Sequence, residues 1–191
     1  EGIEGWAYGL SGTPANRATW RAYNNHASAY DHEYLFFLSE MAPVIHQHVE
    51  FGEMSLVDFT RYWATSWFIN GRLAMDTLDA DFVPQLPHQP YGALARVHPG
   101  DRALVRLIGA GRDLHPFHMH GNHTLMIARD GRLLESVPGV SGPDLAVADF
   151  TFTSAPGQTI DGIFTWTGEK IGWDVYGHKP TDPLLPGEDS A

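Results

Sequence analysis

The sequence contains no cysteine among its 191 residues. Disulfide bonds, thiolate zinc sites and cysteine nucleophiles are therefore excluded. Basic residues are also few, because 12 Lys and Arg stand against 23 Asp and Glu, giving a formal net charge of −11. Affinity for nucleic acid comes mainly from Lys and Arg side chains that neutralise phosphates. Nucleic acid is therefore not an expected partner.

Long hydrophobic runs are missing as well. No apolar run approaches the roughly 18 residues that a membrane-spanning helix needs, so no membrane span is expected. The motifs G-x-S-x-G, G-x-x-x-x-G-K and H-E-x-x-H do not occur, which leaves three common enzyme classes without support. The chain begins Glu1-Gly2-Ile3, without an initiator Met or a signal-peptide pattern. We expect a processed product or a fragment from which any targeting segment has been removed.

The residues that are abundant indicate a β protein. Twenty Gly and 13 Pro punctuate the chain, and turn signals such as Asn70-Gly71 and Asp130-Gly131 separate short apolar stretches. Such spacing is typical of an antiparallel sandwich or barrel. Phe150 and Phe152 are predicted to share one face of a strand. The expected strands are Asp31–Met41, Arg61–Asn70, Tyr91–His98, Asp101–Ile108, Phe117–Arg129, Arg132–Glu135, Asp149–Thr153, Thr159–Trp166 and Ile171–Tyr176.

The chain divides into three parts by composition. Residues 1–30 show no sustained period, and we interpret them as an extended arm or the end of a preceding domain. Residues 31–179 carry the strand signals and form one domain, with a short helical segment at Pro43–Phe51 whose Pro stands at a permitted early position. Residues 180–191 are rich in Pro and acidic residues and should form a loose tail.

Four of the 11 histidines lie within nine residues, at His115, His118, His120 and His123. Successive side chains of a strand point to opposite faces, so His118 and His120 should project together while Phe117 enters the other layer. Neutral imidazoles bind copper, zinc, iron and nickel. The pair is therefore half of a metal site, whereas Pro116 allows His115 to face elsewhere.

The string H-P-F-H-M-H-G-N-H resembles the H-P-x-H-L-H-G-H copper motif of multicopper oxidases. The flanking sequences VHPGDRALVRLIGAG and PGQTIDGIFTWTG, together with YLFFLSEM and FINGR, are similar to strands of the same domain in that family, over roughly residues 31–178. The resemblance implies an all-β fold, a cupredoxin-like antiparallel β-sandwich of Greek-key connectivity with one short helical segment. It also implies copper as the cofactor and an extracytoplasmic location, periplasmic or secreted.

The resemblance assigns roles to the matching histidines. His115 would occupy the type 1 position, at which electrons enter. His118 would be a type 2 ligand and His120 a type 3 ligand of the trinuclear cluster, which reduces O₂ with electrons from a small reductant. His123 stands one place later than the last His of the family motif, and we expect it to support the copper ligands or the fold rather than bind copper itself.

The sequence also departs from the family. The H-W-H, H-C-H and further H-x-H elements are missing, and without Cys a blue type 1 site cannot form within this chain. Another domain or chain is therefore the expected partner, supplying the remaining copper ligands, and a homo-oligomer is one way to do so. The alternative is a non-catalytic cupredoxin-like subunit with a structural or copper-binding role.

The other histidines have weaker claims. His46 and His48 would point about 200° apart on a helix and could not chelate one ion. His32 and His178 lie near expected strand ends, where either could complete a local site. His26, His88 and His98 receive no role. A cupin barrel also uses an H-x-H pair, but it expects a Glu soon afterwards and none occurs before Glu135.

Overall fold

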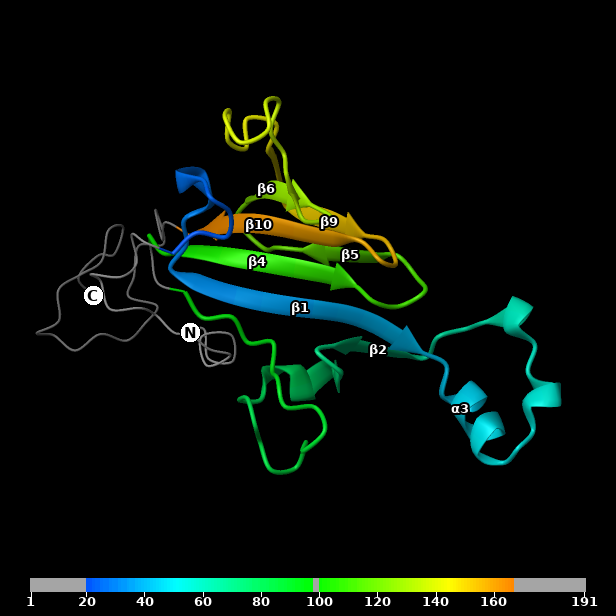
Figure 1. Cartoon of the computed structure of the whole chain (residues 1–191). Coiled ribbons are helices and arrows are strands. Elements are labelled where there is room, and N and C mark those ends of the chain that lie inside the picture. The colour runs from blue at the N-terminus through cyan, green and yellow to red at the C-terminus, as the bar shows by residue number, and fades with distance from the viewer. Residues whose placement is uncertain (1–19, 98–99, 167–191) are drawn as a thin grey trace, which may run out of the picture.

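The computed structural model describes residues 20–97 and 100–166. These residues form a mostly β structure with one α-helix, which confirms the predicted fold class (Figure 1). The α-helix is α3 (Pro43–Glu50), and the 3-10 helices are His26–Ser28, Met54–Leu56, Phe59–Arg61 and Ala74–Leu78. The strands are β1 (His32–Met41), β2 (Ser66–Ile69), β3 (Arg72–Leu73), β4 (Arg102–Gly109), β5 (His115–His118), β6 (Thr124–Arg129), β7 (Arg132–Leu133), β8 (Val147–Asp149), β9 (Thr151–Ser154) and β10 (Thr159–Thr165).

The larger of two sheets has eight strands in the order β3-β2-β1-β4-β10-β6-β7, with β8 paired to β6. All its pairs are antiparallel except β1 with β4, which run parallel in register from His32 opposite Ala103 to Leu38 opposite Gly109. A parallel pair needs a long crossover to bring the chain back to the same end. Residues 42–101 provide that crossover.

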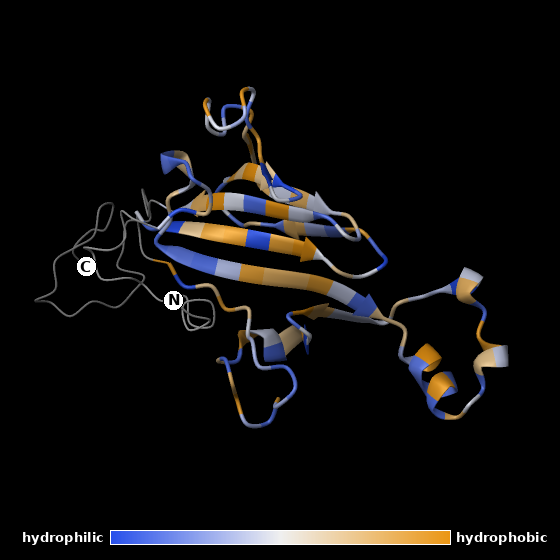
Figure 2. Ribbon diagram, in the orientation of Figure 1, coloured by the Kyte–Doolittle hydropathy of each residue, from blue (hydrophilic) through white to orange (hydrophobic). Residues whose placement is uncertain are grey.

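The smaller sheet, β5 paired with β9, lies against one face of the larger one and completes a sandwich (Figure 1). Alternate residues of β1, Phe36 and Leu38, are buried in the space between the sheets together with Leu107 and Phe152. The Phe36 and Phe117 rings lie 4.9 Å apart between centroids. Burial of each such side chain stabilises the fold by roughly 1.5–3 kcal/mol. Strand β4, which lies between β1 and β10 in the larger sheet, is apolar along most of its length (Figure 2).

Residues 20–30 cover the opposite face of the larger sheet. Tyr23 and Tyr30 pack against a second apolar cluster that includes Leu104 and Ile163. This segment was expected to belong to an arm or a preceding domain. Residues 20–30 contact the sheet, while the predicted boundaries at residues 30 and 179 remain predictions. Residues 1–19 and the predicted tail at 180–191 lie outside the described residues.

One expected strand is absent from the structure, one is divided into two, and a third is not tested. Residues 91–97 form no strand. Some of their backbone groups bond side chains instead of a neighbouring strand. The Gly92 N–H donates to the Asp81 carboxylate, and the Tyr34 hydroxyl accepts from the Arg96 N–H and donates to the Arg96 carbonyl. The expected strand Phe117–Arg129 is two strands, β5 and β6, since Gly121 turns the chain with a φ of 82°. The expected strand Ile171–Tyr176 lies outside the described residues.

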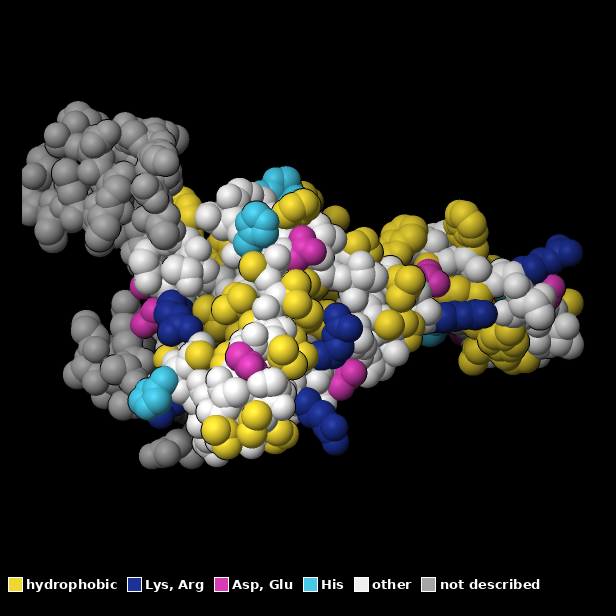
Figure 3. Space-filling view, turned by 90° about the horizontal axis from the view of Figure 1, so that it is seen from above, with side chains coloured by type: hydrophobic (Ala, Val, Ile, Leu, Met, Phe, Trp, Pro, Cys, Tyr) yellow, Lys and Arg dark blue, Asp and Glu magenta, His cyan; other side chains and the backbone are white. Residues whose placement is uncertain are grey.

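The segment between β1 and β2 projects from the sandwich (Figure 1). It begins with α3, whose first residue is Pro43, as predicted. Apolar side chains are exposed over this segment, among them Phe51, Leu56 and Trp63 (Figure 3). Among the described residues, no helix is long and apolar enough to cross a membrane.

Candidate metal centre

Strand β5 and the turn that follows it place the predicted histidines on two faces. Side chains alternate along the strand, so Phe117 and Met119 pack against the core while His118 and His120 are exposed on the other side. The His118 and His120 rings lie 4.9 Å apart between centroids, at an interplanar angle of 74°. The structure therefore brings these two residues together, as the strand period predicted.

Strand β9 supplies the neighbours of His118. Thr151 lies directly opposite in register, and its Oγ1 is 2.8 Å from His118 Nδ1. When Nδ1–H donates to this oxygen, the lone pair of the ring lies on Nε2, which faces away from the bond and is free to bind a metal. Thr151 stands 33 residues from His118 in the sequence, and sequence analysis gave it no role.

Phe150 is the second residue that sequence analysis missed. It was predicted to share a face with Phe152, but Phe152 is buried and Phe150 is half exposed. The reason is that residue 150 lies where the chain passes from β8, paired with β6, to β9, paired with β5. Its ring packs edge-on against both His118, at 5.5 Å, and His123, at 5.4 Å. His123 is therefore a neighbour of this aromatic side chain.

His115 faces away from His118, into the sandwich. Its Nε2 lies 2.7 Å from Oε2 of Glu40, near the end of β1, and the Glu40 side chain is fully buried. The other Glu40 oxygen accepts hydrogen bonds from the backbone N–H groups of Arg112 and Asp113. With Nε2–H donating to Glu40, the Nδ1 atom of His115 carries the lone pair.

The protonation of Glu40 follows from these contacts. Burial raises the pKa of its carboxyl, but hydrogen bonds from the N–H groups of Arg112, His115 and Asp113 outweigh burial and hold the pKa below its usual range. The carboxylate is therefore ionised at neutral pH and fixes the orientation of the His115 ring.

The remaining histidines are separate from this site. His32 is buried beside Asp101, with 2.8 Å between Nε2 and Oδ2. His48 lies 3.2 Å from Glu53, and the helical segment that carries it is confirmed. His98 and His178 lie outside the described residues. Within residues 20–97 and 100–166, no three His, Asp or Glu side chains come together in a way that could hold a metal ion.

Comparison with models of protein families and with curated proteins found no match. Among solved structures, the chain is similar to the multicopper oxidase mgLAC, at 21% identity and a TM-score of 0.47 over 69% of this chain and 32% of that chain. It is also similar to a blue copper oxidase from Nitrosomonas europaea, at 20% identity and a TM-score of 0.46 over 80% of this chain and 35% of that chain.

A third similar structure is the laccase from Botrytis aclada, at 19% identity and a TM-score of 0.44 over 72% of this chain. The chain spans between about a quarter and a third of the length of these three proteins, with coverages of 32%, 35% and 23%. The chain's own residues, rather than these remote similarities, are the basis for assigning a function.

Proposed function

We propose that the chain is a copper-binding, cupredoxin-like domain of a multicopper-oxidase-type protein. His118 and His120 contribute to a type 2/type 3 copper site, and His115 occupies the type 1 position. The observation that carries the proposal is the pairing of two exposed imidazoles on one face of a strand, 4.9 Å apart between ring centroids. Imidazole is a ligand that copper favours, and the pair forms half of a site.

Copper, when bound, supplies one-electron chemistry that couples oxidation of a substrate to reduction of O₂. The residues of the chain would hold and orient the ligands. Thr151 fixes the His118 ring through Nδ1, and Phe150 packs against the same ring. Partners of this kind set the tautomer of a metal-binding His and restrict its motion.

A complete site needs ligands that the described residues do not bring together. We propose that another domain, another chain or a second copy provides them, with O₂ and a small reductant as the other participants. The family resemblance supports an extracytoplasmic location, periplasmic or secreted. The net charge of −11 would favour cationic reductants through electrostatic steering.

A second candidate is a non-catalytic cupredoxin-like subunit with a structural or copper-binding role. It is favoured by the lack of a three-ligand group among the described residues and by the engagement of His115 Nε2 with a buried carboxylate. The two candidates differ in copper stoichiometry and in whether a partner carries the complementary H-x-H motifs.

The deciding experiment measures copper per chain by elemental analysis, in the original protein and in the double variant His118→Ala/His120→Ala. We expect copper in the former and a loss in the latter, with both folded by circular dichroism. Thr151→Val should weaken copper binding by roughly 10- to 100-fold, as other outer-shell changes do. Its matched control is Thr153→Val, on the same face of β9 but opposite Pro116, which should leave the affinity unchanged.

Folded protein without copper in either form would rule out the copper function and leave a structural β-sandwich. Copper retained by the double variant would place the metal elsewhere. If copper is lost as expected, O₂ uptake in the presence of a reductant and a partner with H-x-H motifs separates the oxidase from the non-catalytic subunit.

A further inference from the structure

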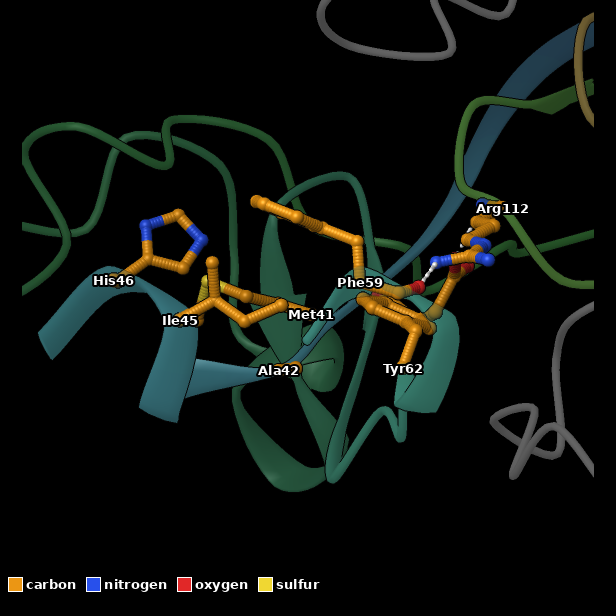
Figure 4. Close-up of a pocket in the computed structure, with 8 residues that line it drawn as sticks. Met41, Ala42, Ile45, His46, Phe59, Tyr62 and Arg112 are labelled. Carbon is orange, nitrogen blue, oxygen red and sulfur yellow. Dashed lines mark hydrogen bonds between the residues drawn. The ribbon is translucent and has the colours of Figure 1, made fainter. Parts of the chain in front are cut away.

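A small cleft opens where the projecting segment joins the sandwich (Figure 4). Its volume is about 270 Å³. Ligand pockets usually enclose about 300–1,000 Å³, so this cleft suits a molecule with a single ring. The residues that line it come from the end of β1, from α3, from the segment before β2 and from the loop after β4: Glu40, Met41, Ala42, Ile45, His46, Phe59, Tyr62 and Arg112.

The walls of the cleft are mainly apolar and aromatic. Met41 and Ile45 lie toward one side and the Phe59 ring toward the middle, while Tyr62 and Arg112 lie together at one end (Figure 4). Phe59 is about half exposed. Aromatic and thioether side chains make favourable contacts with the face or edge of another ring.

Arg112 places a positive charge at the end of the cleft. Its guanidinium carbon lies 4.7 Å from the centroid of the Tyr62 ring, and its Nη1 donates a long bond, 3.4 Å, to the Phe59 carbonyl oxygen. Within the part of the chain that the structure describes, no carboxylate lies within 4.0 Å of this guanidinium. Its planar N–H groups therefore keep the capacity to bind a carboxylate in two-pronged fashion.

Glu40 also borders the cleft, but its charge is already engaged. Its oxygens accept hydrogen bonds from the backbone N–H groups of Arg112 and Asp113 and lie against His115 Nε2. A Cβ built on Gly111 would collide with the carboxylate, which shows how closely the backbone encloses it. The cleft therefore offers a positive group to a ligand while its one bordering carboxylate points into the loop.

We propose that this cleft binds a small aromatic carboxylate, with the ring against Phe59, Met41 and Ile45 and the carboxylate on the guanidinium of Arg112. The ring gains from burial and from aromatic contact. The carboxylate gains a charge-assisted hydrogen bond that stacking on Tyr62 holds in place. A cationic ligand would face Arg112 directly and is disfavoured.

The test uses the full chain without added metal and follows binding by isothermal titration calorimetry. The probes are benzoate, its neutral isostere benzamide, and cyclohexanecarboxylate, which keeps the charge but lacks the aromatic ring. We expect saturable binding of benzoate at one site, at least about tenfold tighter than benzamide, because the charged hydrogen bond is lost. Cyclohexanecarboxylate should bind more weakly than benzoate, since it loses the ring contacts.

Arg112→Gln should weaken benzoate binding at least about tenfold and leave benzamide binding unchanged. The matched control is Arg61→Gln, an arginine of the projecting segment that is highly exposed and does not line the cleft, which should have no effect. Equal binding of benzoate and benzamide by the original protein, or no binding of benzoate, would overturn the proposal without any variant. Because His118 and His120 do not line the cleft, the failure of this proposal and the failure of the copper proposal are distinguishable.

Discussion

At the scale of single residues, the partners of the histidines matter as much as the histidines themselves. His115 and His118 each have one ring nitrogen engaged by an oxygen, from Glu40 and from Thr151. In both cases the other nitrogen is left to act as a ligand, Nδ1 for His115 and Nε2 for His118. The two histidines therefore present different nitrogen atoms on the two faces of β5.

Glu40→Gln should lower the free energy of unfolding by about 1–3 kcal/mol. The substitution keeps the shape of the side chain but removes the charge that accepts the N–H bonds and turns an NH₂ group toward buried donors. Urea denaturation at neutral pH measures the change. Glu53→Gln is the matched control, because the Glu53 side chain is half exposed and contacts only the His48 ring among the described residues; it should change stability by less than about 0.5 kcal/mol. An equal effect of both substitutions would contradict the role of Glu40.

At the scale of elements, a polar network fastens residues 20–30 to the larger sheet. Arg106 on β4 pairs with Glu33 on β1 and with Asp161 on β10. Tyr23 donates to Asp161 and Tyr30 to Glu33. The two tyrosines therefore bond carboxylates on β10 and β1, and Arg106 links both carboxylates to β4, which lies between them.

Tyr23→Phe should destabilise the protein by about 1–3 kcal/mol, because a hydrogen bond to a charged carboxylate is lost. The amide protons of residues 20–30 should exchange faster in this variant, and hydrogen exchange followed by mass spectrometry measures that effect. Tyr91→Phe is the control, since no hydrogen bond of the Tyr91 hydroxyl is found among the described residues. Unchanged exchange in Tyr23→Phe would show that apolar packing alone holds the segment.

The same network predicts a loss of stability at high pH. Burial, the charge of Glu33 and the hydrogen bond to it raise the pKa of Tyr30 to about 12, and burial and the bond to Asp161 raise the pKa of Tyr23. A raised pKa in the folded state stabilises the fold below the usual value near 10 and loses that contribution as the pH rises through the folded-state value. Stability should therefore fall above about pH 10, and Tyr23→Phe should fall less steeply. Parallel curves for the two proteins would contradict this account.

At the scale of the whole molecule, the exposed histidine pair is open to a second ligand-bearing surface. His118 and His120 lie on the outer side of the smaller sheet, and the described residues bring no third ligand to them. A copper ion bound there would retain open coordination positions. Two copies of the chain could fill them from two such pairs.

Adding one equivalent of Cu(II) per two chains should therefore promote association into dimers. Size-exclusion chromatography with light scattering measures the change in mass, and His118→Ala/His120→Ala should remain at its metal-free mass. Chelation of the copper should reverse the association. Tight binding of copper by a chain that stays monomeric would instead indicate that the remaining ligands come from residues outside the described part.

The sequence by itself determined the β architecture, the short helix after Met41 and the facing of the histidines, because these follow from local turn chemistry and the two-residue period of a strand. The parallel pairing of β1 with β4 depends on how a 60-residue crossover, residues 42–101, returns to the sheet. Glu40 and Thr151 lie 75 and 33 residues from the histidines that they contact. No local pattern encodes such contacts: the pairing of β5 with β9 brings Thr151 to His118, whereas Glu40 and His115 stand on strands of different sheets and meet only when the sheets pack. Only the tertiary structure therefore decided which ring nitrogen of each histidine faces an oxygen.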